Sequence, residues 1–138
     1  MNAYVDSSAY LRRLLNQPGA IPDMDRWERA YSSRLLRTES LRTAHRLRLE
    51  GKIDDATLSL FIMEIESLSR SIHLLPLDDD VLEQAGRPYP TVVGTLDAIH
   101  LATALTIRER GNDPIAILTH DIQLGAAARA HGFPVEGI

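Results

Sequence analysis

The sequence predicts a three-layer α/β/α fold, in which helices cover both faces of a central, mostly parallel sheet of four to five strands. Short β-prone runs alternate with longer amphipathic runs along the chain, and this order is typical of right-handed βαβ crossovers. The run Ile115–Leu118 is apolar at every position, as expected for a strand covered on both faces. A length of 138 residues suits one domain, so we expect residues 1–138 to form a single unit.

The N-terminal half contains the first of these strands and helices. Ala3–Val5 is a short β-prone run, and Asp6 begins a helix that ends near Leu15, before the turn at Pro18-Gly19. The next expected elements are a helix over about Pro22–Ala30, a strand over Ser33–Leu36, a helix over Glu39–Glu50 that Thr38 caps, and a helix that begins at Asp54-Asp55. Gly51 separates the last two helices, and the second of them repeats apolar residues at helical spacing.

The C-terminal half continues the alternation of strands and helices. Its expected elements are a strand over Ile72–Leu75, a helix over Asp78–Ala85, a loop over Gly86–Gly94, a helix from Thr95 to about Arg110, a strand over Ile115–Leu118, a helix from about Asp121 to Ala130, and a short last strand into which Pro134-Val135 leads. Thr95 and Asp121 have the short polar side chains that cap helices, and Gly132 stops the last helix.

The composition excludes several classes of protein. The chain has no cysteine, which rules out a disulfide scaffold, a thiolate zinc site and a cysteine nucleophile. No apolar stretch approaches the roughly 20 residues that cross a bilayer, and the first residues do not resemble a signal peptide, so we expect a cytoplasmic protein. The net charge of −4 argues against binding nucleic acid by charge alone, although bound cations would reverse the local charge of an acidic cleft.

Three of four acidic side chains fall where an open parallel sheet binds ligands, outside the carboxyl ends of its strands, and the fourth opens a helix that leads into a strand. Asp6 follows the first expected strand, and Asp121 follows the strand at 115–118. Glu39 begins the helix after the second strand, and Asp97 lies in the first turn of the long helix that starts at Thr95. Each could serve only as a helix cap or first-turn acid. Together, converging carboxylates must share protons or bind a hard cation, and oxygen ligands suit Mg²⁺ or Mn²⁺.

The segments around these carboxylates resemble PIN-domain nucleases, and in particular the VapC toxins of bacterial toxin–antitoxin pairs. Four segments match the family's motifs in the family's order: Tyr4–Ala9, Ser32–Glu39, Thr95–Ala104 and Leu118–Asp121. The segment Thr95–Ala104 is the most specific of these, and the ordered set covers nearly the full length. Gly94 stands where many family members carry a basic residue.

This resemblance implies a PIN fold and a Mg²⁺- or Mn²⁺-dependent endoribonuclease that acts as a toxin and is inhibited by a cognate antitoxin. The residues that take the family's acidic positions, and that we expect to be catalytic, are Asp6, Glu39, Asp97 and Asp121. We expect Asp6 and Asp97 to bind the metal directly and Asp121 to bind it directly or through water. Glu39 would hold a second ion or orient the attacking water. The family commonly forms homodimers, which we also expect of this chain.

Four further residues are expected to contribute to substrate binding. Thr119 matches a hydroxyl that often lies beside the last carboxylate of the family, and Ser7 can support the first. Arg42 and Arg46 lie three and seven residues after Glu39, on roughly the same helix face. Solvated helix charges, or pairing with a nearby glutamate, explain the two arginines equally well.

Two histidines lie beside the acidic motifs. His100 follows Asp97 by one helical turn, and packing within the helix layer is its favoured interpretation. His120 either orients a phosphate or is simply exposed. The sequence therefore leaves open whether either imidazole contacts a substrate.

Two other classes of function compete with a nuclease. Phosphoryl-transfer domains also place aspartates at strand ends, but they normally need a lysine in the site, and the one lysine here, Lys52, lies in a turn between helices. The chain has neither a phosphate-binding P-loop nor a dinucleotide-binding glycine motif. A catalytically inactive PIN-like domain that binds RNA or protein is the second alternative, and the loss of an acidic position would have favoured it.

Overall fold

The part of the chain that the computed structural model describes, residues 1–111 and 113–138, forms a five-stranded parallel sheet with β1 at its centre. The strands are β1 (Asn2–Val5), β2 (Ala30–Ser33), β3 (His73–Leu75), β4 (Ile115–Leu118) and β5 (Val135–Glu136). They lie in the order β3-β2-β1-β4-β5, and all neighbouring pairs are parallel. The predicted α/β fold with a parallel sheet of four to five strands is therefore confirmed.

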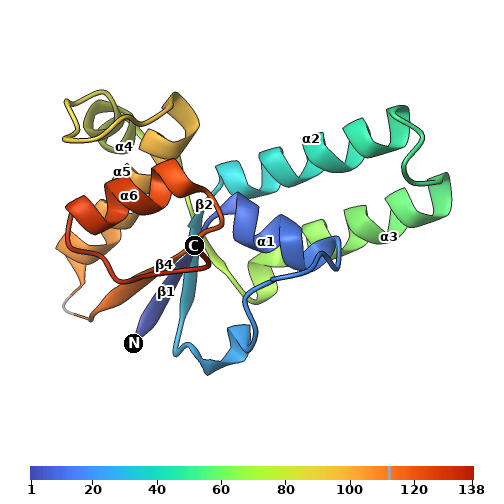
Figure 1. Ribbon diagram of the computed structural model, residues 1–138, viewed down its shortest axis with the longest axis horizontal. Coiled ribbons are helices and arrows are strands. Elements are labelled where there is room, and N and C mark those ends of the chain that lie inside the picture. Colours follow the sequence, from blue (N-terminus) through green and yellow to red (C-terminus); the bar gives the residue numbers. More distant parts are fainter. Residues whose placement is uncertain (112) are drawn as a thin grey trace.

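Within the same residues, six α-helices cover the two faces of this sheet (Figure 1). They are α1 (Ser7–Leu14), α2 (Leu35–Leu49), α3 (Asp55–Glu66), α4 (Asp79–Ala85), α5 (Thr95–Arg110) and α6 (Ile122–Ala130). The first three lie on one face and the last three on the other, and the hairpin of α2 and α3 projects beyond the sheet. None of these helices combines the length and the hydropathy that crossing a membrane requires.

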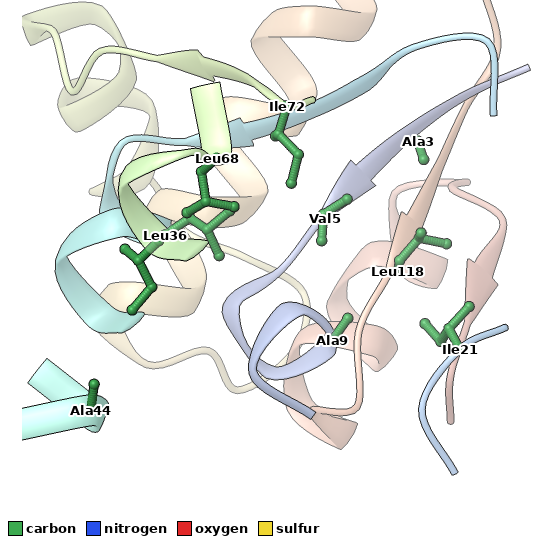
Figure 2. Close-up of a cluster of buried hydrophobic side chains, with 10 residues drawn as sticks. Ala3, Val5, Ala9, Ile21, Leu36, Ala44, Leu68, Ile72 and Leu118 are labelled. Atoms are coloured by element: carbon green, nitrogen blue, oxygen red, sulfur yellow. The ribbon is translucent and has the colours of Figure 1, made fainter. Parts of the chain in front are cut away.

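Alternate residues of β1 contribute to two different hydrophobic cores. Ala3 and Val5 are fully buried in the first core, together with Leu36 of α2 (Figure 2). Tyr4 is buried in the second core, together with Leu101 of α5. Because successive side chains of a strand point to opposite faces of the sheet, the register of β1 directs Tyr4 toward the α5 layer.

Most helix starts agree with the sequence predictions. Asp54, Asp78 and Asp121 cap α3, α4 and α6, and each side chain accepts a backbone N–H from the first turn of its helix. The predicted cap of α5 is wrong, because Gly94 occupies the cap position and Thr95 is already helical. Short side chains that accept hydrogen bonds therefore identify three of these four helix starts.

The segment between α1 and α2 differs from its prediction. The helix predicted over Pro22–Ala30 is wrong, because only Met24–Arg26 forms a turn of 3-10 helix. Asp23 before this turn has a left-handed φ of 48°, and Trp27 after it is extended. A left-handed residue cannot continue a right-handed helix, so the helical turn is limited at both ends.

Helix α2 begins earlier than predicted. The strand predicted over Ser33–Leu36 lies instead at Ala30–Ser33, where it pairs with both β1 and β3. As a consequence α2 starts at Leu35, and Thr38 is not its cap. Glu39 therefore lies in the second turn of α2 rather than at its start. The hydrogen-bonded ladders, which local sequence does not encode, determine where this strand ends.

Candidate active site

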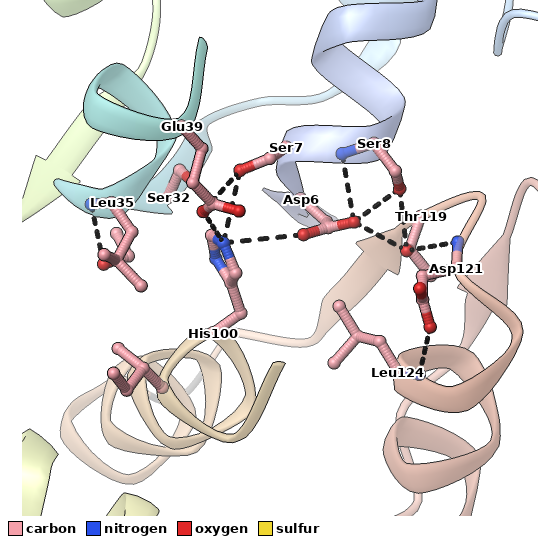
Figure 3. A network of polar contacts seen from close by, with 12 residues as sticks. Asp6, Ser7, Ser8, Ser32, Leu35, Glu39, His100, Thr119, Asp121 and Leu124 are labelled. Carbon is pink, nitrogen blue, oxygen red and sulfur yellow. Dashed lines mark hydrogen bonds and ion pairs between the residues drawn. The ribbon is translucent and has the colours of Figure 1, made fainter. Parts of the chain in front are cut away.

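Four carboxylates lie at the carboxyl end of the sheet or on helices that begin there. Asp6 follows β1 directly, and Asp121 lies just beyond β4. Glu39 extends from the second turn of α2, and Asp97 lies in the first turn of α5. Figure 3 shows Asp6, Glu39 and Asp121 in one polar network with His100. The fold thus gathers side chains that are remote from one another in the sequence.

Asp6 is buried, and protein donors occupy one of its two carboxylate oxygens. Its Oδ2 accepts hydrogen bonds from Ser8 N at 3.2 Å, from Ser8 Oγ, and from Thr119 Oγ1 at 2.8 Å. Ser8 Oγ also accepts the backbone N–H of His120 at 2.9 Å. Asp6 Oδ1 accepts no hydrogen bond from the described residues and lies 3.6 Å from His100 Nε2. The carboxylate is therefore fixed in orientation, with one oxygen left for a ligand.

Glu39 is bound by two side chains from other elements. Its Oε1 accepts a hydrogen bond from Ser7 Oγ at 2.8 Å and lies 2.7 Å from His100 Nε2. His100 is buried, and its Nδ1 lies 2.7 Å from the hydroxyl of Tyr4. The interpretation of His100 as a helix-packing residue is thus incomplete, because both ring nitrogens have polar partners. The spacing of three residues from Asp97, which puts both side chains on one helix face, was the available signal.

Asp97 experiences the negative charge of the whole group. Burial is the largest of the causes that raise the pKa of the Asp97 carboxyl to about 6, and the charges of Asp121 and Asp6 add to it. Glu39 raises this pKa further, whereas His100 lowers it. Such interactions between charges fall off with distance, so the raised pKa reflects negative charge in the surroundings of Asp97.

Two of the carboxylates also cap helices, which was the alternative explanation for them. Asp6 caps α1 through Ser8 N, and Asp121 Oδ1 caps α6 through Leu124 N at 2.9 Å. The backbone N–H of Asp121 donates to Thr119 Oγ1 at 3.0 Å, which links the two caps. Each cap uses a single carboxylate oxygen, so capping and ligand binding do not exclude each other.

The last strand supports the segment that carries Asp121. Thr119 N donates a hydrogen bond to Glu136 O at 3.0 Å, and His120 Nδ1 lies 2.7 Å from Gly137 O. Gly137 has a φ of 105°, and a Cβ at this position would clash with the carbonyl oxygen of Thr119. The end of the chain therefore contributes to the geometry of the site through its backbone.

The two hydroxyls that were expected to bind substrate are buried. Ser7 donates its hydroxyl proton to Glu39, and Thr119 donates its own to Asp6. Both hydroxyls are thus directed at carboxylates rather than at the surface. Direct contact of either one with a substrate stays a prediction.

The two arginines expected to bind substrate lie farther along α2. Arg42 and Arg46 are exposed and line a shallow pocket of about 320 Å³ together with Leu49. Arg46 Nε lies 3.8 Å from Glu50 Oε1, so the pairing considered for this residue is present. In the described part of the chain, neither arginine forms an ion pair with the four carboxylates. Their contact with RNA stays a prediction.

The lysine that a phosphoryl-transfer site would need lies elsewhere. Lys52 Nζ is 2.9 Å from Glu50 Oε2, in the turn that joins α2 to α3. This turn forms the tip of the projecting hairpin, away from the sheet (Figure 1). The structure therefore does not support a phosphoryl-transfer site of that kind.

The oxygen atoms of the four carboxylates, Asp6, Glu39, Asp97 and Asp121, suit a hard divalent cation. Across residues 1–111 and 113–138, no set of three or more acidic or histidine side chains is placed to hold a metal ion, so these residues form no ligand cage. Mg²⁺ does not require such a cage, because it commonly takes one or two carboxylates and keeps several waters. Asp6, which has a free oxygen, and Asp97, which is crowded by like charges, are suited to hold such an ion.

Comparison with known proteins finds similarity over nearly the whole chain. The family model described as PIN domain matches residues 3–130, a range that includes all four carboxylates and ends before β5. "Ribonuclease VapC47" of Mycobacterium tuberculosis (strain CDC 1551 / Oshkosh) is 30% identical, over 94% of this chain and 92% of the relative. The similarity therefore extends over the sheet and both helical layers.

Proposed function

Because the chain belongs to the PIN domain family, in its VapC-type branch, we propose that it is a divalent-metal-dependent endoribonuclease and the toxin of a toxin–antitoxin pair. The observation that carries this proposal is the cluster of four carboxylates, in which the pKa of Asp97 is raised to about 6. Clusters of this kind mark functional sites. The similar ribonuclease supports RNA as the substrate. Residues 1–138 act as one nuclease unit in this proposal, since β5 belongs to the same sheet.

In the proposed site, Asp6 and Asp97 would hold Mg²⁺ directly and Asp121 would hold it directly or through water, with Mn²⁺ as the expected substitute. When bound, the ion supplies Lewis acidity to the phosphodiester and makes water a better nucleophile. Asp6 presents Oδ1, because Ser8 and Thr119 occupy its other oxygen. These fixed hydrogen bonds orient the carboxylate before the ion arrives, as supporting groups do in other metal sites.

Glu39 orients the attacking water in this proposal. Ser7 and His100 both bind Oε1, whereas Oε2 accepts no hydrogen bond from the described residues. An ionised carboxylate only accepts hydrogen bonds, so a water beside Oε2 must direct a proton toward it. This arrangement turns a lone pair of the water away from Glu39, which is the orientation that an attack on phosphorus needs.

Removing Arg42 and Arg46 together is expected to weaken RNA binding about tenfold and to make it less dependent on salt. The two side chains lie about 4.5 and 10.5 Å along the helix axis from Glu39, so they can follow a strand that leaves the carboxylates. Fluorescence anisotropy of labelled RNA at several salt concentrations, in EDTA to prevent cleavage, measures the effect. Arg110→Ala is the control, because it lies about 20 Å along α5 from Asp97. Unchanged affinity in the double variant would remove both arginines from the proposal.

The proposal includes two kinds of protein partner. A cognate antitoxin would inhibit the enzyme by directing an arginine toward the carboxylates, since guanidinium groups bind carboxylates strongly. On the α2–α3 hairpin, Leu49, Leu60 and Met63 are 89%, 62% and 69% exposed. Exposed apolar side chains on one element are typical of contact surfaces, and they support a homodimer that uses this hairpin.

Incubation of structured RNA with the purified protein and Mn²⁺ or Mg²⁺ tests the function. We expect endonucleolytic cuts that disappear on addition of EDTA and return when the cation is restored in excess. Denaturing gels resolve the products, and several unrelated RNAs should be included because the recognised sequence is unknown. If no RNA is cut under any of these conditions, a domain that only binds RNA or protein becomes the better description.

A further inference from the structure

We propose that Tyr4 and His100 form a hydrogen-bonded relay that positions Glu39, so that His100 is a positioning residue for RNA cleavage. The inference rests on the proposed function and deepens it by adding two residues to the site. Tyr4 comes from β1 and His100 from α5, and the two side chains meet beneath Glu39 of α2. Figure 3 shows the imidazole of His100 beneath the carboxylate of Glu39, with the carboxylate of Asp6 to its right.

The direction of each hydrogen bond follows from the chemistry of the partners. The Glu39 carboxylate only accepts, so Nε2 of His100 must carry a proton and donate it across 2.7 Å. In the neutral ring, Nδ1 is then an acceptor, and the Tyr4 hydroxyl donates to it across 2.7 Å. The Tyr4 oxygen in turn accepts the backbone N–H of Ser33 at 3.1 Å. One backbone amide of β2 therefore sets the orientation of three side chains.

The relay is buried along its length, which makes its geometry rigid. Tyr4 and His100 are each 1% exposed, and their rings pack edge to face with centroids 5.9 Å apart. In such surroundings an unpaired polar atom is costly, so the paired arrangement is strongly favoured over any other. Glu39, by contrast, has a side chain that is 24% exposed and could otherwise rotate into solvent.

The two donors on Oε1 have a direct consequence for the reaction. A free glutamate side chain populates several rotamers, and only some of them would place Oε2 of Glu39 beside the other three carboxylates. His100 and Ser7 select one of these rotamers and leave Oε2 in a fixed place. Misplacing a catalytic group by about 1 Å can lower a rate about 100-fold, so the relay acts on turnover rather than on RNA binding.

His100→Leu is expected to lower kcat about 10- to 100-fold, the range found when a supporting partner is removed, with the Kd for RNA unchanged. His100→Gln retains an N–H near the position of Nε2 and should recover part of this loss. In His100→Leu/Glu39→Gln, kcat should equal that of Glu39→Gln alone, because His100 acts through Glu39. If the double variant instead loses kcat by the product of the two single-variant factors, His100 does not act through Glu39 and the relay is overturned. The control is Thr106→Val, which removes another buried hydroxyl of α5 and should leave kcat unchanged.

A measurement that needs no activity separates the relay from the proposed function. At a pH high enough for the ring to be neutral, ¹⁵N NMR of the metal-free protein should show His100 protonated at Nε2 and unprotonated at Nδ1. Tyr4→Phe should shift the Nδ1 signal, and Glu39→Gln should shift the Nε2–H signal. A proton on Nδ1 alone would overturn the relay, whether or not RNA is cut. So would Nδ1 and Nε2 signals that do not shift in either variant. Absence of cleavage by the wild-type protein would refute the proposed function, and the NMR signals would still decide the positioning of Glu39. Where His100→Leu unfolds, Tyr4→Phe and His100→Gln replace it in the kinetic test.

Discussion

Asp97→Asn is expected to lower RNA cleavage on the order of 10³-fold, the scale seen when a group that stabilises developing charge is lost. The proposed site depends on Asp97 as an ionised oxygen ligand, and an amide retains the shape of the side chain without its charge. Single-turnover cleavage with saturating protein measures the effect without interference from product release. Asp6→Asn should give a loss of similar size, because Asp6 presents the other free ligand oxygen.

The same substitution is expected to stabilise the metal-free protein at pH 7 by about 1 kcal/mol. The folded protein raises the pKa of Asp97 from 3.8 to about 6, so ionisation of this carboxyl disfavours the folded state. A shift of this size would correspond to about 3 kcal/mol, but Asp97 is only half-buried and solvent screens part of the effect. The benefit of asparagine should be largest above pH 6, and it should disappear below pH about 4, where aspartate is protonated in both states. Urea unfolding at several pH values measures this.

Asp80→Asn is the matched control for both effects. Asp80 is also an aspartate in the first turn of a helix, but it is exposed and does not belong to the cluster of four carboxylates. Removing its charge should leave cleavage unchanged and should lower stability slightly, because an acid near a helix N-terminus is favourable. If Asp97→Asn behaves in the same way, Asp97 is only a first-turn acid.

The sheet and most helices could be predicted because their signals are local. Ile115–Leu118 is apolar at every position, and Asp54 and Asp78 are short acceptors directly before helical patterns. The strand Ala30–Ser33 could not be placed in the same way, because its position depends on pairing with β1 and β3. Its serines are buried through tertiary hydrogen bonds, such as that from Ser32 Oγ to Val5 O at 2.6 Å. The residues next to Ser32 in the sequence do not indicate that Val5 O is its hydrogen-bond partner.

The strand-end carboxylates and the hydroxyls of Ser7 and Thr119 beside them could be predicted, whereas the contacts of Tyr4 and His100 could not. Strand ends and family motifs identify the carboxylates directly, because both can be recognised in the linear sequence. Tyr4 looks like an ordinary strand residue, and only the register of β1 shows that it faces His100. His100 meets Glu39 across two helical layers, and the sequence does not encode that approach. The roles of Tyr4 and His100 therefore emerge from packing, even where the carboxylates are evident from the sequence.

Adding Mn²⁺ to the metal-free protein at pH 7.5 is expected to stabilise it by about 2.7 kcal/mol when the ion is present at 100 times its Kd. The stabilisation should weaken below pH about 6, because the cation must displace the proton that Asp97 carries there. Displacement of one proton costs about tenfold in affinity for each pH unit below that value. Titration calorimetry and thermal unfolding at pH 5, 6 and 7.5 measure the two effects.

One physical cause links this result to the stability of the metal-free protein. Burial and the like charges of Asp121 and Asp6 make ionised Asp97 unfavourable, and a bound cation compensates for both. A variant that relieves the crowding without the ion should therefore lose affinity for the ion. Asp97→Asn should be more stable than the wild type without Mn²⁺ and gain little from it. Equal stabilisation of both proteins by Mn²⁺, or an affinity that stays constant between pH 5 and 7.5, would show that the ion binds elsewhere.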